Sequence, residues 1–258
     1  MHQKEFWDSQ AAHFSRIMES NEEAEYFRKL VDFLVEKCGT GKGRRILDVG
    51  CGAGKYSRAF VRLGSEVVMT DFSEQMLKYA EKACADDPGK AVAVLCDWTS
   101  DDYLKQSWSG AFDLVFASMV PGIASSESIR RMNSASRNLC FIAIFAKRTD
   151  HMYEAFAKAA DLSEPETKLS ANHEDIIARI KEFGYTPEVH YVDYGWENLW
   201  TVDEAVARYE NALRSSGAKE LLEHDRLIKA AQEMADTDGM DLDRSDATAA
   251  WMLWSVKR

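Results

Sequence analysis

Three glycines stand at alternate positions in the stretch DVGCGAGKYS: Gly50, Gly52 and Gly54. The apolar run Arg45–Val49 before them predicts a strand, and the residues after them predict a helix. At such a corner the bare backbone approaches a ligand, and unpaired amides at the helix N-terminus point at the ligand's anionic group. Three glycines in five residues cost chain entropy, which favours a close approach over a turn alone.

The spacing of these glycines separates two ligand classes, because dinucleotides and S-adenosylmethionine both use such a corner. The dinucleotide fingerprint G-x-G-x-x-G would need its third glycine at position 55, which is Lys55 here. Asp48 stands at the strand end, where a carboxylate holds an ammonium group directly or through water and repels a pyrophosphate. The pattern therefore favours S-adenosylmethionine.

The elements that position this corner alternate between strands and helices, which is the pattern of a parallel sheet covered on both faces. We expect seven strands: Arg45–Val49, Glu66–Phe72, Ala91–Cys96, Phe112–Ala117, Leu139–Ala146, Glu188–Trp196 and Ala249–Val256. Ser73 is the expected N-cap of the helix after the second strand, and Glu127–Arg137 is a further expected helix. The fold class is therefore α/β: a Rossmann-like, doubly wound, seven-stranded, mostly parallel sheet with helices on both faces.

The segment ILDVGCGAGKYS resembles the first motif of class I S-adenosylmethionine-dependent methyltransferases, and three further matches follow in order over Arg45–Ile123. VVMTDFSEQML puts Asp71 where the superfamily's acid binds both ribose hydroxyls, with Phe72 beside the adenine. A carboxylate accepts well from two vicinal hydroxyls. VLCDW puts Asp97 where the family holds the adenine amino group, and Trp98 where a side chain covers the ring.

The fourth match is FDLVFASMVPGI, whose backbone near Ala117 and Ser118 faces the methionine end of the cofactor in the family. The order of the four motifs carries the resemblance, because each motif alone is weak. It implies S-adenosyl-L-methionine as cofactor and S-adenosyl-L-homocysteine as product. The implied cofactor residues are Asp48, Gly50, Cys51, Gly52, Gly54, Asp71, Phe72, Met76, Asp97, Trp98, Ala117 and Ser118. Trp98 is equally expected as a core residue, and Cys51 as a small residue in the turn.

Two helical regions are expected outside the shared core. Apolar residues repeat at the spacing of one buried helix face within Phe6–Cys38. The resemblance implies that residues 1–40 form a lid over the cofactor, with Trp7, His13 and Phe14 in it. The remaining residues, 41–258, form the methyltransferase domain. A helical cap is inserted at about 197–247, between strands six and seven, where T-x-x-E at Thr201 predicts a helix start.

Methyl transfer from a sulfonium is an in-line displacement, so the protein mainly aligns and desolvates the nucleophile. The sequence identifies no catalytic residue, and neither His13 nor His151 is assigned as a base. The run Ser118–Pro121 lacks the N/D-P-P-Y/F of enzymes that methylate amino groups of nucleic acid or glutamine. We expect a small-molecule acceptor, with oxygen, nitrogen, sulfur and carbon all open as the accepting atom, and no metal.

Aromatic residues gather in the stretch YVDYGWENLWTVDEAVARYE: Tyr191, Tyr194, Trp196, Trp200 and Tyr209. One interpretation is that they line the pocket of a flat or cationic acceptor by stacking and cation–π attraction. The other is that they pin the inserted helices onto the sheet. The second interpretation is favoured, because contiguous exposed aromatics are uncommon.

The composition excludes several classes of protein. A net charge of −11 over 258 residues disfavours nucleic acid, because that affinity comes largely from Lys and Arg. The cysteines lack C-x-x-C spacing, so neither disulfides nor a zinc site is expected: Cys38, Cys51, Cys84, Cys96 and Cys140. The start MHQKEFWDSQ has no signal-peptide run, and no window approaches ~20 apolar residues. We expect a cytoplasmic protein without membrane contact, either monomeric or homodimeric.

Three alternatives to methyl transfer stay open. A protein that binds S-adenosylmethionine as a sensor or scaffold would hold the cofactor and consume none. A nucleotide-dependent oxidoreductase is supported only by the shared strand–turn–helix corner, and both Lys55 and Asp48 count against it. An aminopropyl transferase would need a decarboxylated ligand, which no feature of the sequence indicates.

Overall fold

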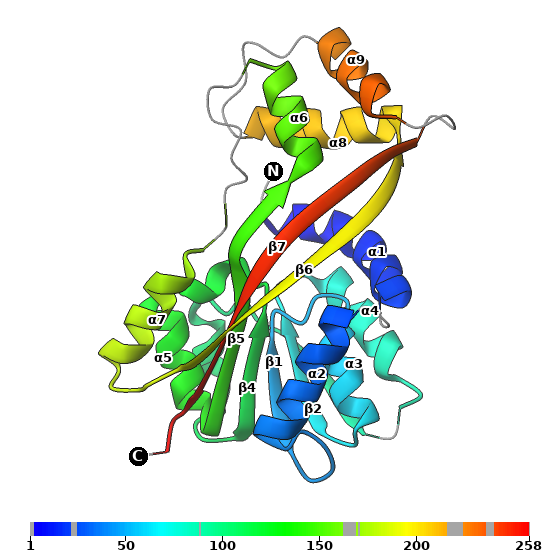
Figure 1. Cartoon of the computed structure of the whole chain (residues 1–258). Helices are drawn as coiled ribbons and strands as arrows, with labels where there is room; N and C mark the ends of the chain where they lie inside the picture. The colour runs from blue at the N-terminus through cyan, green and yellow to red at the C-terminus, as the bar shows by residue number, and fades with distance from the viewer. Residues whose placement is uncertain are drawn as a thin grey trace. The chain divides into compact units, whose positions relative to one another are not determined.

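The structure is a computed structural model that describes residues 3–21, 25–87, 89–161, 169, 171–215, 224–235 and 240–257. Within these residues, seven strands form one sheet in the order β3-β2-β1-β4-β5-β7-β6 (Figure 1). They are β1 (Arg45–Val49), β2 (Glu66–Asp71), β3 (Lys90–Leu95), β4 (Phe112–Ser118), β5 (Ser136–Asp150), β6 (Glu188–Thr201) and β7 (Met240–Ser255). The pairs β1–β2, β2–β3, β1–β4 and β4–β5 are parallel. The predicted seven-stranded, mostly parallel sheet is confirmed.

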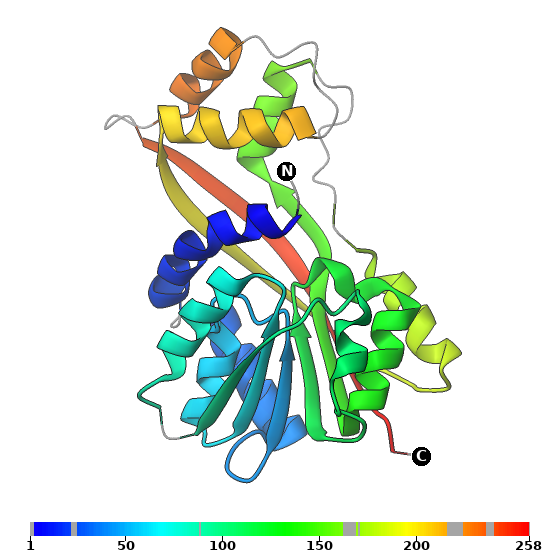
Figure 2. The same ribbon diagram turned by 180° about the vertical axis from the view of Figure 1, so that it is seen from behind.

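Helices lie on both faces of this sheet, as the sequence predicts; α2 is on one face and α5 on the other (Figures 1 and 2). The α-helices are α1 (Gln3–Asn21), α2 (Glu25–Cys38), α3 (Lys55–Arg62), α4 (Glu74–Cys84), α5 (Ser126–Ala135), α6 (His151–Ala159), α7 (His173–Glu182), α8 (Val202–Ser215) and α9 (His224–Met234). Short 3₁₀ helices follow β3 and β4: η1 (Asp101–Lys105) and η2 (Pro121–Ala124).

The chain divides into two compact units. The first comprises Met1–Ile144, Ala171–Val192 and Ala250–Arg258, and the second comprises Phe145–Ser170 and Asp193–Ala249. The first unit contains β1 to β4 and their helices. The second contains α6, α8 and α9, which share one buried apolar cluster: Met152, Phe156, Ala157, Ala160, Ala205, Val206, Tyr209, Leu213, Leu227 and Ala231.

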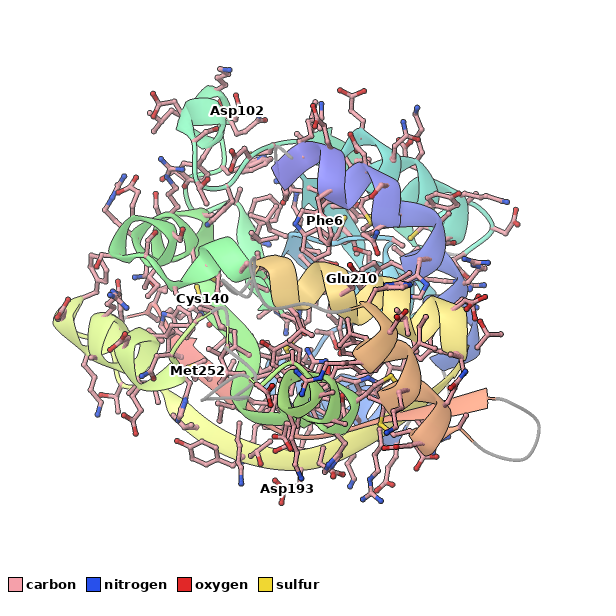
Figure 3. All side chains as sticks on the ribbon, turned by 90° about the horizontal axis from the view of Figure 1, so that it is seen from above. Phe6, Asp102, Cys140, Asp193, Glu210 and Met252 are labelled. Atoms are coloured by element: carbon pink, nitrogen blue, oxygen red, sulfur yellow. The ribbon has the colours of Figure 1, made fainter. Side chains whose placement is uncertain are left out.

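The central strands are buried because their sequences are almost continuously apolar. Phe116 of β4 stacks on Phe141 of β5 with ring centroids 5.4 Å apart, and it meets Phe60 of α3 edge to face at 5.2 Å. Cys140 of β5 and Met252 of β7 are also fully buried (Figure 3). This packing fixes the strand ends that carry the predicted cofactor residues.

The ends of several elements differ from the predicted ones. β5 extends to Asp150, β6 extends to Thr201 and β7 begins at Met240. Strand pairing tolerates the polar residues at these strand ends. Hydrophobic periodicity therefore does not reveal how far the strands extend. The helix expected to end at Arg137 instead ends at Ala135, because the next residue takes an extended backbone and starts β5.

The helical region expected within Phe6–Cys38 is two helices, α1 and α2. Residues 22–24 between them lie outside the described residues. The predicted cap region at about 197–247 contains α8 and α9, and residues 216–223 and 236–239 within it are likewise outside the described residues. The lid role of residues 1–40 and the cap role of this region stay predictions.

Both predicted helix caps are confirmed. The Ser73 hydroxyl accepts a hydrogen bond from the Met76 amide at 3.1 Å and caps α4. Thr201 and Glu204 cap α8 reciprocally. The Thr201 amide donates to the Glu204 carboxylate at 3.0 Å, and the Glu204 amide donates to the Thr201 hydroxyl at 3.3 Å.

Thr201→Ala removes the hydroxyl that accepts from the Glu204 amide. We expect the free energy of unfolding to fall by about 1 kcal/mol, the usual cost of losing a side-chain cap. Urea unfolding followed by circular dichroism measures this change. Thr201→Ser is the matched control, because it keeps the hydroxyl and should stay close to the wild type. Equal unfolding midpoints for the Ala and Ser variants would contradict the role of this cap.

Candidate cofactor site

The three glycines of the loop between β1 and α3 all adopt the left-handed backbone region: φ is +66° at Gly50, +55° at Gly52 and +93° at Gly54. The amide of Cys51 donates to the Thr70 carbonyl at 2.8 Å, which ties the loop to β2. Gly54 is the N-cap of α3, and no side chain caps that helix. The α3 N-terminus therefore presents backbone amides beside the carboxyl end of β1.

A Cβ atom added at each glycine would meet different surroundings, which separates the roles of the three. At Gly50 it would lie 2.7 Å from Val120 Cγ2, and at Gly54 it would lie 2.8 Å from Ala80 Cα. At Gly52 it would meet no atom of the described residues within 4 Å. Gly50 and Gly54 therefore permit close packing within the protein, whereas Gly52 faces open space that a ligand can fill.

The Asp71 carboxylate lies at the carboxyl end of β2 and holds the glycine loop. Its Oδ2 accepts from the Gly52 amide at 3.0 Å, and its Oδ1 accepts from the Ser73 amide at 2.9 Å. Burial raises the pKa of Asp71, and these backbone hydrogen bonds oppose the rise. Each carboxylate oxygen has a second lone pair, so the group can also accept from a vicinal diol.

The Asp48 carboxylate is only 2% exposed at the carboxyl end of β1. Burial raises the pKa of Asp48 to about 7; the charge of Asp71 adds to the rise, and the hydrogen bond from Ser57 opposes it. The Ser57 hydroxyl donates to Asp48 Oδ2 at 2.6 Å. A cationic group placed beside this carboxylate would favour its charged form. Sequence reasoning missed Ser57, whose contact with Asp48 spans β1 and α3.

Two further predicted residues follow Asp71 in the chain. Phe72 is half-buried, and Met76 of α4 is buried against Ala11 of α1 and Ala53 of the loop. Met76 therefore packs α1 and α4 onto the glycine loop, and its contact with the cofactor stays a prediction.

Cys51 is the remaining predicted residue of the loop. Its thiol donates to the Gly52 carbonyl at 3.4 Å. Burial raises the pKa of Cys51 well above its usual range, and the charges of Asp48 and Asp71 raise it further. The group therefore stays a neutral thiol near pH 7 and offers no nucleophile.

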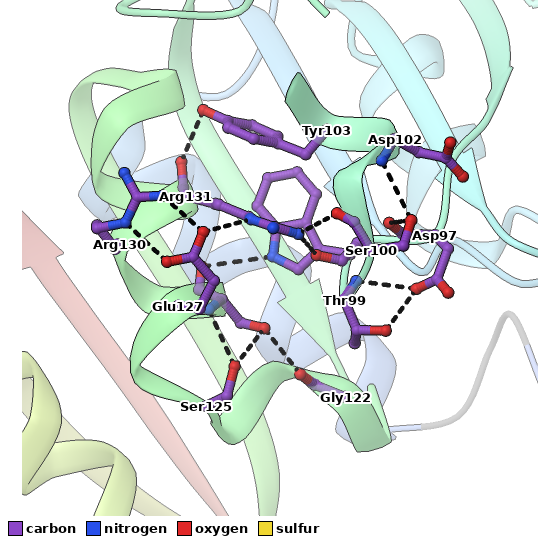
Figure 4. Close-up of polar contacts among 12 residues, drawn as sticks. Asp97, Thr99, Ser100, Asp102, Tyr103, Gly122, Ser125, Glu127, Arg130 and Arg131 are labelled. Carbon is purple, nitrogen blue, oxygen red and sulfur yellow. Dashed lines mark hydrogen bonds and ion pairs between the residues drawn. The ribbon is translucent and has the colours of Figure 1, made fainter. Parts of the chain in front are cut away.

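Asp97 and Trp98 lie on the loop after β3, and the structure assigns them different surroundings (Figure 4). Asp97 Oδ1 accepts from the Thr99 amide at 2.8 Å and from the Thr99 hydroxyl at 2.7 Å. Trp98 is only 5% exposed. Its indole packs on Tyr103 at 5.0 Å and donates to the Ser128 carbonyl at 3.4 Å. This placement favours the core role of Trp98 over contact with an adenine ring.

The end of β4 approaches the glycine loop. Ala117 is fully buried, and Ser118 is half-buried at the last position of the strand. Met119 follows with φ +56°, which is strained for a residue other than glycine. Val120 then contacts the position of Gly50. Sequence reasoning missed Val120, because nothing local in the sequence reports a contact across seventy residues.

The aromatic run divides into separate groups. Tyr194 and Trp196 lie 6.2 and 6.0 Å from the ring of Phe145. Tyr209 is buried and stacks on Phe156 at 5.4 Å, and its hydroxyl donates to Asp150 at 3.0 Å. Trp200 packs against the same helical cluster as Tyr209, and Tyr191 is 58% exposed. The placement of Tyr209 and Trp200 favours packing of the helices over contact with an acceptor.

The described residues contain no group of three His, Cys, Asp or Glu side chains that could hold a metal ion. In the same part of the chain, no helix is long and apolar enough to cross a membrane. His151 Nε2 lies 2.7 Å from Asp246 Oδ2, and His13 packs edge to face on Phe14.

Residues 46–140 match a protein family described as a methyltransferase domain. The crystal structure of magnesium protoporphyrin IX methyltransferase from Synechocystis PCC 6803 with bound S-adenosylhomocysteine has the same fold. It covers 91% of this chain and 83% of its own, with a TM-score of 0.53 and 13% sequence identity. The family match and the shared fold confirm the predicted resemblance to class I S-adenosylmethionine-dependent methyltransferases.

Curated relatives share a shorter part of the chain. The malonyl-[acyl-carrier protein] O-methyltransferase of Hamiltonella defensa is 40% identical over 76 residues, which are 29% of this chain and 30% of that protein. The ubiquinone biosynthesis O-methyltransferase of Bordetella avium is 42% identical over 50 residues, which are 19% of this chain and 21% of that protein. The chain thus spans less than a third of the length of these relatives.

The buried Asp48 carboxylate makes stability depend on pH. Its pKa in the folded chain is about 7 against 3.8 for the ordinary group, so the unfolded chain ionises first as the pH rises. Wild-type stability should therefore fall relative to Asp48→Asn between these two pH values, by up to about 4 kcal/mol, and the difference should then level off. Urea unfolding of both proteins at a series of pH values measures the difference. A difference that does not change with pH would contradict this account of Asp48.

Proposed function

We propose that this chain is an enzyme that transfers a methyl group from S-adenosyl-L-methionine to a small-molecule acceptor. One observation carries the proposal: the backbone of Gly52 faces open space and is hydrogen-bonded to the Asp71 carboxylate. An open glycine corner beside a carboxylate suits a ligand that has both a vicinal diol and a cationic group. The methyltransferase domain family that residues 46–140 match and the named activities of the relatives support the same conclusion.

Each residue of the corner has a separate role in this proposal. Asp71 accepts hydrogen bonds from the ribose hydroxyls while it holds the loop through the Gly52 amide. Asp48 balances the positive charge of the amino-acid end, directly or through water, and is held in place by Ser57. Phe72 borders the adenine. Bound S-adenosylmethionine supplies the activated methyl group, so the protein needs to align the acceptor rather than activate it strongly.

The acceptor in this proposal is a small molecule. The net charge of −11 opposes contact with a phosphate backbone. The end of β4 also lacks the N/D-P-P-Y/F sequence of enzymes that methylate amino groups of nucleic acid or glutamine. We place the protein in the cytoplasm, a proposal supported by five cysteines that are all free thiols.

Isothermal titration with S-adenosylhomocysteine tests the cofactor, with NADH as a parallel control ligand. We expect binding of S-adenosylhomocysteine and none of NADH. Binding of NADH alone, or of neither ligand, would overturn the cofactor assignment. A screen of small acceptors with a labelled methyl donor then tests the transfer. Tight cofactor binding without transfer to any acceptor in a broad screen would favour a sensor or scaffold over an enzyme.

Asp71→Ala should weaken the binding of S-adenosylhomocysteine by about 1 to 3 kcal/mol, about 5-fold to 150-fold in Kd. The ribose hydroxyls and the Gly52 amide both lose an acceptor in this variant. Glu74→Ala is the control, because it removes an equal charge from an exposed side chain nearby that pairs with Lys4. Titration calorimetry measures both affinities, and circular dichroism checks the fold. Equal affinities for the two variants would show that the ribose lies elsewhere.

A further inference from the structure

Arg131 is a buried cation whose contacts reach the loop after β3 (Figure 4). It belongs to α5, and its Nη1 donates to the carbonyls of Trp98 and Ser100, both at 2.5 Å. Its Nε donates to the Glu127 carboxylate at 2.9 Å, and its guanidinium lies 5.5 Å from the ring centre of Tyr103. The Arg131 side chain therefore links two carbonyls of the loop to α5 through charge-assisted hydrogen bonds.

The two carbonyls bracket Thr99, and Thr99 in turn holds Asp97. The Thr99 amide and hydroxyl both donate to Asp97 Oδ1. Among the described residues no donor reaches the other oxygen, Oδ2. The Asp97 carboxylate is thus held by one oxygen and presents the other, which is the arrangement needed to accept a hydrogen bond from a ligand.

Gly122 of η2 supports the same loop from a different element. A Cβ atom added at Gly122 would lie 2.7 Å from Thr99 Cγ2. A rotation of the Thr99 side chain away from that atom would move its hydroxyl from Asp97 Oδ1. The position of Asp97 therefore depends on Arg131 from α5 and on the close approach of Gly122.

Arg130 is a natural comparison for Arg131, because both side chains pair with Glu127. Arg130 donates to both carboxylate oxygens of Glu127, at 2.8 and 2.5 Å. The hydrogen bond from Arg130 has the largest effect on the pKa of Glu127. Together with the hydrogen bond from Arg131 it lowers that pKa to about 2. The Arg130 side chain is half-exposed and that of Arg131 is 5% exposed. In the described residues only Arg131 of this pair donates to the loop carbonyls.

We propose that Arg131 is a positioning residue that holds Asp97 for recognition of the adenine amino group, and so sets the selectivity of the site for adenine. The proposal rests on the cofactor proposed above. An amino group donates a hydrogen bond to the exposed oxygen of Asp97. The oxo group of hypoxanthine would face that carboxylate with lone pairs against lone pairs. Selectivity therefore depends on how firmly the loop holds the carboxylate in place.

Titration calorimetry with two ligands tests this role: S-adenosylhomocysteine and S-inosylhomocysteine, which has hypoxanthine in place of adenine. We expect the wild type to prefer the adenine ligand by about 10-fold or more, the effect of one unmet polar partner. Arg131→Met should lose most of this preference, because the adenine ligand binds more weakly while the affinity for the hypoxanthine ligand hardly changes. Arg130→Met should keep the wild-type preference, since in the described residues Arg130 donates no hydrogen bond to the loop carbonyls.

The ratio of the two affinities separates positioning from general loosening of the fold. A role of Arg131 in stability alone would lower both affinities equally in Arg131→Met and would overturn the proposal. A wild type that binds both ligands equally would also overturn it, while leaving the proposed function intact. A wild type that binds neither ligand would overturn the proposed function and this inference together.

Gly122→Ala gives a second test that keeps the buried cation in place. It should narrow the preference for the adenine ligand by displacing Thr99, and with it Asp97. An unchanged ratio in both Gly122→Ala and Arg131→Lys, with both proteins folded, would contradict the proposal. Arg131→Lys keeps the charge but loses the planar fork that meets Glu127 and the two carbonyls together, so its ratio should fall between those of the wild type and Arg131→Met.

Discussion

Two carboxylates lie buried at the carboxyl ends of adjacent parallel strands, and the site is organised around that constraint. Burial raises the pKa of both Asp48 and Asp71, and the charge of Asp71 raises the pKa of Asp48 further. Hydrogen bonds from Ser57, Gly52 and Ser73 offset only part of this cost. A ligand that brings a positive charge and two hydroxyls can offset more of it. The same groups that limit the stability of the folded chain therefore favour binding.

The strand order explains how residues far apart in sequence come to one edge of the sheet. β3, β2, β1 and β4 are parallel neighbours, so Asp97, Asp71, Asp48 and Ser118 all lie at or just beyond carboxyl ends. The order reverses between β1 and β4, which is where open α/β sheets bind their ligands. Val120, which follows β4, contacts the position of Gly50, which follows β1. The segments after these two strands therefore meet where the strand order reverses.

Much of the fold could be predicted because its signals are local: apolar runs gave the central strands, and caps such as Ser73 gave helix starts. The glycine loop and Asp71 could be located from motif spacing for the same reason. The packing of Trp98 could not be predicted from the sequence, since a large apolar ring suits either a core or a ligand. The burial of Arg131 could not be predicted either, because a charged residue in a helix is usually solvated and only the fold shows that this one is buried.

A crystal structure of the protein with S-adenosylhomocysteine would show whether the two buried carboxylates hold the ligand. We expect the ribose hydroxyls to lie within hydrogen-bond distance of the Asp71 carboxylate, the ligand to cover the open face of Gly52, and its amino group to lie near Asp48. A ligand bound elsewhere, with Asp71 holding only the amides of Gly52 and Ser73, would contradict this role of the carboxylates.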